Sequence, residues 1–76
     1  MLKSVEKLIR DYKAGKKKAT YGNHWMVVTN LGVKFYYHNT AICVVDNAGN
    51  VTYDAGQWAG SSSTTRAINS YKQYFC

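Results

Sequence analysis

The sequence predicts a small α+β domain in which an N-terminal and a C-terminal helix flank an antiparallel sheet of three or four strands. Two observations carry this prediction. Apolar residues recur at three- and four-residue steps near both ends of the chain, and the middle holds short runs rich in Val, Ile, Tyr and Phe. With 76 residues, 46% of them hydrophobic, the chain has room for one core. We therefore expect a single domain over residues 1–76, in the order helix, three strands, a short fourth strand, helix.

The first predicted element is a basic amphipathic helix over residues 2–13, and with the lysine loop that follows it fills residues 1–18. One side of its helical wheel holds Leu2, Val5, Leu8, Ile9 and Tyr12. The opposite side carries cations. Gly15 can adopt the left-handed conformation that ends a helix, so the lysines after it are expected in a loop.

Positive charge is concentrated in this N-terminal segment. Residues 1–18 hold seven basic and two acidic residues, a net charge of +5, whereas residues 19–76 hold three basic and two acidic residues, a net charge of +1. Such asymmetry favours one electropositive surface. The residues expected to make electrostatic contacts with a partner are Lys3, Lys7, Arg10, Lys13, Lys16, Lys17 and Lys18. The alternative is a solvated helix face that keeps a small protein soluble.

Residues 20–58 are predicted to form an antiparallel meander. Strands are expected over 25–29, 33–38, 40–46 and 51–54, with turns at 30–32 and 47–50. Residues 41–45 are apolar at every position, as in a strand covered on both faces. Two helices can cover one face of such a sheet. If the second face also carries Val, Tyr and Trp, it needs a partner, such as a second copy of the chain, another protein or nucleic-acid bases. The alternative is an amphipathic second face with hydroxyls in water.

A second helix is predicted over residues 64–75, with Ser63 or Thr64 as its N-cap. Apolar residues recur at helical spacing through Ile68, Tyr71 and Phe75. Hydroxyls, free backbone N–H groups and a guanidinium meet where this helix begins. The candidate anion site there consists of Ser63, Thr64, Thr65 and Arg66. Capping alone is the competing explanation for the Ser and Thr residues.

Short motifs in the second half of the chain resemble a group of short phage and prophage proteins. The motifs are an extended Tyr37-x-x-Thr40-x-Ile42 segment, a turn, and Trp58 followed by Thr64-Thr65-Arg66-x-Ile68-Asn69. Members of that group have two residues between the Arg or Lys and the Ile or Leu, whereas this chain has one. The resemblance covers roughly the last forty residues. It implies a mobile-element origin and a shared small fold, and it transfers no catalytic residue.

The sequence offers no convincing catalytic pattern, so we expect no enzyme activity and no cofactor. It contains no Gly-x-Ser-x-Gly elbow, phosphate-binding loop or dinucleotide fingerprint, and its four acidic residues disfavour a carboxylate-based nuclease. We expect no metal either. Cys43 is expected in the core. Its pairing with Cys76, or a metal site with His24 and His38, remains open but matches no zinc spacing.

No targeting or membrane-spanning segment is visible in the sequence. Charge interrupts the N-terminus early, and no run approaches the roughly 18 apolar residues of a membrane span. The first helix is short and lacks the Trp or Phe typical of interfacial membrane anchors. The expected compartment is the host cytoplasm, where thiols stay reduced.

Two binding functions from different classes remain. The first is a stoichiometric phage or mobile-element inhibitor that occupies a host or defence nucleoprotein complex, as anti-CRISPR proteins do. The second is direct nucleic-acid binding, in which basic residues neutralise phosphates while Trp25, Tyr36 or Tyr37 contact bases. No zinc finger, recognition helix or RNA-recognition motif supports the second. The sequence favours the inhibitor, because the charge lies on one helix and its exit loop while the rest is rich in aromatics. Nucleic-acid mimicry is disfavoured by the positive charge.

Overall fold

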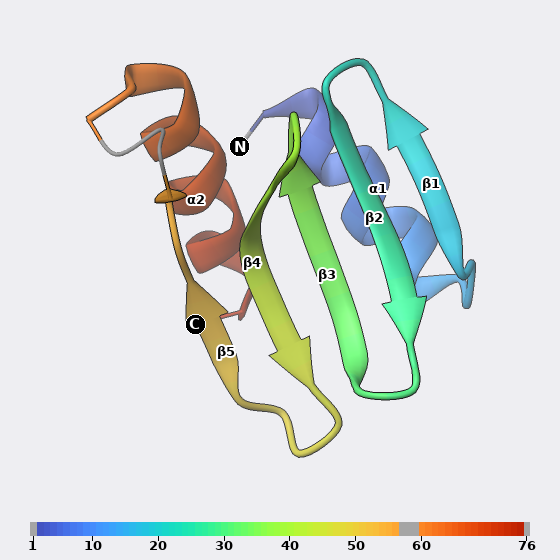
Figure 1. The fold of residues 1–76 in the computed structure, drawn as a ribbon. Coiled ribbons are helices and arrows are strands. Elements are labelled where there is room, and N and C mark those ends of the chain that lie inside the picture. Colours follow the sequence, from blue (N-terminus) through green and yellow to red (C-terminus); the bar gives the residue numbers. More distant parts are fainter. Residues whose placement is uncertain (1, 57–59, 76) are drawn as a thin grey trace.

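The fold is a two-layer arrangement of a sheet and two helices (Figure 1). The computed structural model describes residues 2–56 and 60–75. Its elements are α1 Lys3–Lys13, β1 Lys18–Tyr21, β2 His24–Thr29, β3 Gly32–Tyr37, β4 Thr40–Asp46, β5 Val51–Tyr53 and α2 Ser62–Phe75. Strands that follow one another in the chain pair antiparallel, so the sheet is a five-stranded meander in the order β1-β2-β3-β4-β5. The predicted α+β class and element order are confirmed.

The structure contains one strand more than the four whose ranges the sequence predicts. β1 pairs with β2 from Lys18 to Tyr21, so the meander begins inside the segment that was expected to be a lysine loop. Exposed and half-buried residues alternate along β1. A four-residue segment that begins with a lysine is too short and too polar to be distinguished from a loop by its sequence pattern.

Helix α2 begins two residues earlier than predicted. The backbone N–H of Thr65 donates to the carbonyl oxygen of Ser61 at 3.0 Å, and this places Ser61 at the N-cap position before Ser62. The prediction that Ser63 or Thr64 caps this helix is therefore wrong, since both lie in its first turn. Trp58, which belongs to the phage-like motif, and Cys76 lie outside the described residues.

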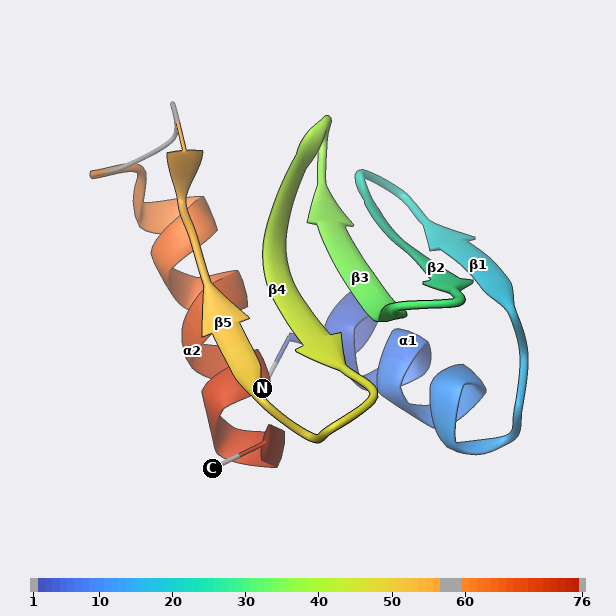
Figure 2. The ribbon, with the colours of Figure 1, turned by 60° about the horizontal axis from the view of Figure 1, so that its bottom comes forward.

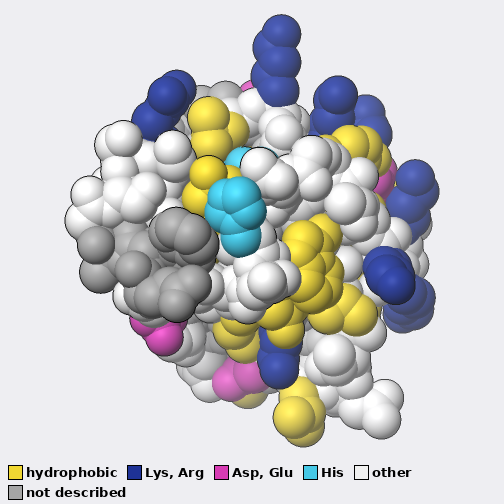
Figure 3. Space-filling model, turned by 45° about the horizontal axis from the view of Figure 1, so that its top comes forward, with side chains coloured by type: hydrophobic (Ala, Val, Ile, Leu, Met, Phe, Trp, Pro, Cys, Tyr) yellow, Lys and Arg dark blue, Asp and Glu magenta, His cyan; other side chains and the backbone are white. Residues whose placement is uncertain are grey.

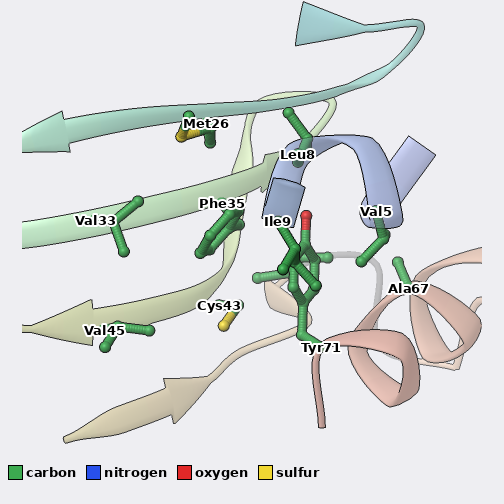
Figure 4. Packing of buried hydrophobic residues seen from close by; sticks show 11 residues of the cluster. Val5, Leu8, Ile9, Met26, Val33, Phe35, Cys43, Val45, Ala67 and Tyr71 are labelled. Atoms are coloured by element: carbon green, nitrogen blue, oxygen red, sulfur yellow. The ribbon is translucent and has the colours of Figure 1, made fainter. Parts of the chain in front are cut away.

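Both helices pack on the same face of the sheet (Figure 2). The core between the layers is one cluster, formed by Val5, Leu8, Ile9, Met26, Val33, Phe35, Ile42, Cys43, Val45, Ala67 and Tyr71. Phe35 is at its centre, with ring centroids 4.7 Å from Tyr71, 5.7 Å from Phe75 and 5.8 Å from Tyr12. Figure 4 shows the side chains of the core cluster converging from the strands and from both helices. The two helices also meet near the chain ends, where the N–H of Leu2 donates to Ser70 Oγ at 3.1 Å.

A bulge in β4 explains why two adjacent residues of the apolar run 41–45, Ile42 and Cys43, both face the core. The register between β3 and β4 shifts after Phe35, which pairs with Cys43 while Tyr36 pairs with Ala41. The extra residue, Ile42, is fully buried beside Cys43, so two consecutive apolar residues serve the same core. The expectation of helices or other cover on both faces is not met, because no described element lies over the second face.

Cys43 is in the core, as predicted, with none of its surface exposed. Burial raises the pKa of its thiol to about 12, so it stays protonated at neutral pH and is a poor nucleophile. Across residues 2–56 and 60–75, no three His, Cys, Asp or Glu side chains come together as metal ligands. The described helices are too short and too polar for any of them to span a membrane.

Candidate functional site

The uncovered face of the sheet, here called the open face, carries two parallel rows of side chains that cross the strands. The aromatic row consists of Thr20, Trp25, Tyr36 and Ala41. The lysine row consists of Lys18, Val27, Lys34, Val44 and Thr52. Neighbours in each row are register partners on adjacent strands. The rows are two residues apart along β1, β2 and β3, a separation of roughly 7 Å, and three residues apart on β4, where the bulge lies.

The alternation of side chains along the strands separates these rows from the core. Met26 and Phe35 point towards the helices and are fully buried. Their neighbours Trp25 and Tyr36 point the other way and keep part of their surface exposed. Figure 3 shows hydrophobic side chains forming a yellow band with dark-blue Lys and Arg side chains at its border. The open face thus carries Val, Tyr and Trp side chains. This is the condition under which the sequence predicts that the face needs a partner.

Trp25 and Tyr36 form a tightly stacked pair at the centre of the aromatic row. Their ring centroids are 3.8 Å apart and the ring planes differ by 2°. The indole Nε1–H of Trp25 donates to the carbonyl oxygen of His38 at 2.7 Å. The N–H of His38 donates in turn to the carbonyl oxygen of Asn23 at 2.8 Å. These bonds tie the pair to the turns at one end of the sheet, so the rings are held in place before any ligand arrives.

His38 has an uncommon backbone conformation, with φ at 55°. A non-glycine residue pays a conformational cost in this left-handed region. The turn between β3 and β4 is held in that conformation by the two hydrogen bonds to His38, one from Trp25 and one to Asn23. The strained turn and the stacked pair therefore support one another.

The lysines of the lysine row share the open face with a carboxylate, because Asp46 pairs with Gly32 and follows Val44 on the same side of β4. Among the described residues, neither Lys18 nor Lys34 forms a salt bridge. The carboxylate of Asp46 accepts hydrogen bonds from the N–H groups of Ala48 and Asn50 within its own turn, and the bonds with Asn50 hold its pKa below the usual value. Asp54 accepts the N–H of Gly56. These two carboxylates thus bind backbone N–H groups of their own turns rather than Lys18 or Lys34.

Asp11 pairs with two of the cations of the predicted basic surface. Its carboxylate is 3% exposed and accepts a hydrogen bond from the hydroxyl of Tyr21. Arg10 Nη2 and Lys16 Nζ lie 3.4 and 3.6 Å from its Oδ1. The Tyr21 bond and the two cations hold the pKa of Asp11 below its usual value, against the effect of desolvation. Arg10 and Lys16 therefore help to dock α1 on β1.

The seven predicted contact cations do not form one surface. Lys3, Lys7, Arg10 and Lys13 lie on α1, in the helix layer, whereas Lys18 lies on the open face. Two of the helix lysines also face tyrosine rings, since Lys7 Nζ is 5.6 Å from the ring centroid of Tyr21 and Lys13 Nζ is 5.4 Å from that of Tyr74. Lys16 and Lys17 occupy the loop between the two layers.

The predicted contact aromatics are also divided between the faces. Trp25 and Tyr36 are together on the open face, but Tyr37 packs against the core cluster and stacks on His24 at 4.7 Å. Lys34 was not among the predicted site residues. The signal for it was present, because Lys34 and Tyr36 alternate with Phe35 and Tyr37 and so share a face.

The four residues of the candidate anion site point in different directions. Thr64 is fully buried and Thr65 Oγ1 donates to the carbonyl oxygen of Ser61 at 3.0 Å. Ser63 and Arg66 remain at the surface, and with Leu2, His24 and Tyr37 they line a pocket of about 190 Å³. Desolvation, with a smaller contribution from His38, lowers the pKa of His24. The neutral imidazole adds no positive charge to this pocket at neutral pH.

Comparison of the chain with protein-family models, with curated proteins and with solved structures yields no match. The resemblance to short phage proteins therefore stays a prediction.

Proposed function

We propose that this chain is a nucleic-acid-binding protein whose lysine row neutralises backbone phosphates. The observation that carries the proposal is the pair of lysines, Lys18 and Lys34, on an uncovered sheet face, where neither forms a salt bridge with a described residue. Lys17 precedes Lys18 in the chain and adds a further positive charge, and the chain as a whole has a net charge of +6. A charge of this sign and size attracts phosphates and accelerates association with them.

The position of Lys34 favours a phosphate-bearing partner over a protein partner. Lys34 lies between Val27 and Val44 in the middle strand of the sheet. Lysine is depleted from protein–protein interfaces because its strongly hydrated ammonium is costly to bury there. In contrast, an ammonium among apolar residues is well placed to replace a counterion of a phosphate backbone. The inhibitor function that the sequence favours requires an acidic protein patch opposite this lysine.

The test is fluorescence anisotropy with labelled DNA and RNA oligonucleotides, repeated at several salt concentrations. We expect the logarithm of the association constant to fall linearly with the logarithm of salt concentration between about 50 and 200 mM. Lys18→Glu and Lys34→Glu should each weaken binding and lower the slope by about 0.7 per lost contact with a single strand. Lys72→Glu is the matched control, because it makes the same charge change on α2, in the helix layer.

Two results would overturn the proposal. One is the absence of binding to any oligonucleotide at the lowest salt concentration. The other is an equal loss of affinity in Lys34→Glu and Lys72→Glu, which would mean that net charge acts without a site. If nucleic acid is not bound and one host protein is retained after nuclease treatment of a lysate, the inhibitor function replaces it.

A further inference from the structure

Resting on the proposed function, we infer that the aromatic row is a platform for unpaired bases, so that the ligand is a single strand rather than a duplex. The inference depends on the rigid Trp25–Tyr36 stack and on its placement beside the lysine row. Base stacking on aromatic side chains is the usual source of affinity for single strands, and it requires no particular base sequence.

The stacked pair leaves two ring faces for a ligand. Each ring uses one face for its partner at a centroid distance of 3.8 Å. Next in the row are Thr20 on the side of Trp25 and Ala41 on the side of Tyr36. Both neighbours are small, so a flat base can approach each outer ring face and continue the stack.

The hydrogen bond from Trp25 to His38 lowers the conformational-entropy cost of binding a ligand on this platform. The indole is fixed by its bond to the carbonyl oxygen of His38 at 2.7 Å, and Tyr36 is fixed by the parallel stack. Side chains that are already ordered lose little conformational entropy when a ligand binds. The platform therefore does not need the ligand to complete it.

The two rows match the two parts of a nucleotide chain. Bases over the aromatic row leave the sugar-phosphate backbone over Lys18 and Lys34, roughly 7 Å away along the strands. The pairing of stacking groups with adjacent cations is the arrangement expected of a surface that binds single strands. The carboxylate of Asp46 lies on the same face beyond Val44 and is held by the N–H groups of its own turn, on the side of the lysine row away from the aromatic row.

A duplex fits the open face poorly. Five strands spaced about 4.8 Å apart give a surface roughly 19 Å across, whereas the major groove of B-DNA is about 12 Å wide and admits a helix or a two-stranded ribbon. A duplex on this face could be contacted only through its phosphates. Trp25 and Tyr36 would then contribute nothing to its binding.

A second copy of the chain is also a poor occupant. In a two-fold symmetric dimer the open face meets itself, so Lys18 and Lys34 of each copy would be buried against a face that also carries lysines. Neither lysine has a salt bridge within the described residues, and burial of their strongly hydrated ammonium groups in a protein interface is costly. The open face thus suits a polyanion better than a second copy of the chain.

The experiment compares three ligands at one salt concentration: a labelled single strand, the duplex of the same sequence, and an abasic strand that keeps the phosphates but lacks the bases. We expect the single strand to bind at least tenfold more tightly than the other two. Trp25→Ala and Tyr36→Ala should each weaken single-strand binding roughly 5- to 150-fold, the range for loss of one stacked base. Binding of the abasic strand should be unchanged.

Two further variants keep the test valid if the alanine variants fold poorly. Tyr36→Phe keeps the ring and should retain affinity, whereas Tyr36→Leu keeps apolar bulk without an aromatic face and should lose it. Tyr74→Ala is the matched control, because this tyrosine is 38% exposed on α2, in the helix layer. Its affinity for the single strand should equal that of the wild type.

The outcomes separate this inference from the proposed function. Equal affinity for all three ligands, or full affinity in Tyr36→Leu, would overturn the platform while nucleic-acid binding stands. No binding to any of the three would overturn both. Sedimentation of the free protein as a dimer that dissociates in the Tyr36→Leu variant would replace the platform by an interface between copies.

Discussion

Neighbouring residues of the same strands have different roles on the two faces of the sheet. Phe35 and Met26 are fully buried under the helices, while Tyr36 and Trp25, the adjacent residues, keep exposed surface on the open face. On the covered face an aromatic ring stabilises the fold by leaving water. On the open face a ring of similar size buries less and remains available to a ligand. The aromatic content of a sequence therefore indicates function only after the face of each ring is known.

The largest expected effect is a difference in stability between alanine substitutions at adjacent positions. Phe35→Ala should lower the free energy of unfolding by about 3–5 kcal/mol, because it leaves a cavity at the centre of the core. Tyr36→Ala should cost only about 0.5–1.5 kcal/mol, chiefly the stack with Trp25. Urea unfolding followed by circular dichroism measures both. Similar losses in the two variants would contradict the division of the faces.

The next prediction concerns Asp11, where acid should weaken the attachment of α1 to β1. Its pKa is lowered in the folded state, mainly by the hydrogen bond from Tyr21, so its stabilising effect is present above the unfolded value of 3.8 and is lost as pH falls through the folded value. Asp11→Asn should be less stable than the wild type at neutral pH, and the difference should shrink below pH 3.8.

A control is needed because Asp46 also has a lowered pKa, owing to Asn50. Asp46→Asn should show the same sign of pH dependence without loosening α1. Unfolding measured at both pH values, with hydrogen exchange of α1 as the second readout, separates the two carboxylates. A stability difference for Asp11→Asn that does not vary with pH would rule out the assigned role of its charge.

A smaller effect is expected when the bond that holds the stacked pair is removed. Trp25→Phe keeps an aromatic ring but loses the donor to His38, and it should cost about 0.5–1.5 kcal/mol of unfolding free energy. Because the rings still stack, single-strand affinity should fall less than in Trp25→Ala. Thermal unfolding and anisotropy measure the two effects. Equal affinities in Trp25→Phe and Trp25→Ala would show that the indole bond, rather than the ring, matters for binding.

The smallest expected effect is a gain on the covered face. The hydroxyl of Tyr71 points towards α1 in the core (Figure 4), is fully buried, and has no hydrogen-bond partner among the described residues. An unpaired buried polar group is costly. Tyr71→Phe should therefore raise the free energy of unfolding by up to about 1 kcal/mol, measured by urea unfolding. A clear loss of stability would mean that this hydroxyl has a partner in solution.

Periodicity was enough to predict most of the fold. The apolar repeat from Leu2 to Tyr12 located α1 to within one residue of its start, and the apolar run around Cys43 located β4. β1 was not predicted because its four residues form too short a sequence pattern to be distinguished from a polar loop. The start of α2 was misplaced by two residues, because any of several consecutive Ser and Thr residues could serve as the cap.

The open face could be foreseen only in part. The alternation of side chains predicted that Tyr36 lies on the opposite face of the sheet from Phe35. The stack of Tyr36 with Trp25, however, depends on strand register. That register follows from a two-residue turn at Asn30 and Leu31, which makes Thr29 the partner of Gly32 and so brings Trp25 to Tyr36. The predicted turn over residues 30–32 has three residues, and a register shifted by one residue would have sent one of the rings into the core. The contact of Asp11 with Tyr21 is likewise tertiary and leaves no local signal.

The hydrogen bond between Leu2 and Ser70, 68 residues apart in the chain, bears on the order of folding. Every strand pairing is a hairpin between chain neighbours, and such local contacts form quickly. The helix layer, however, needs both ends of the chain, since Val5 and Tyr71 belong to the same core cluster. During synthesis the strands of the meander can pair while α2 is still inside the ribosome. The face of the sheet that the helices cover, however, stays in contact with water until the last turn of α2 emerges. The core of this fold can therefore close only once α2 has left the ribosome.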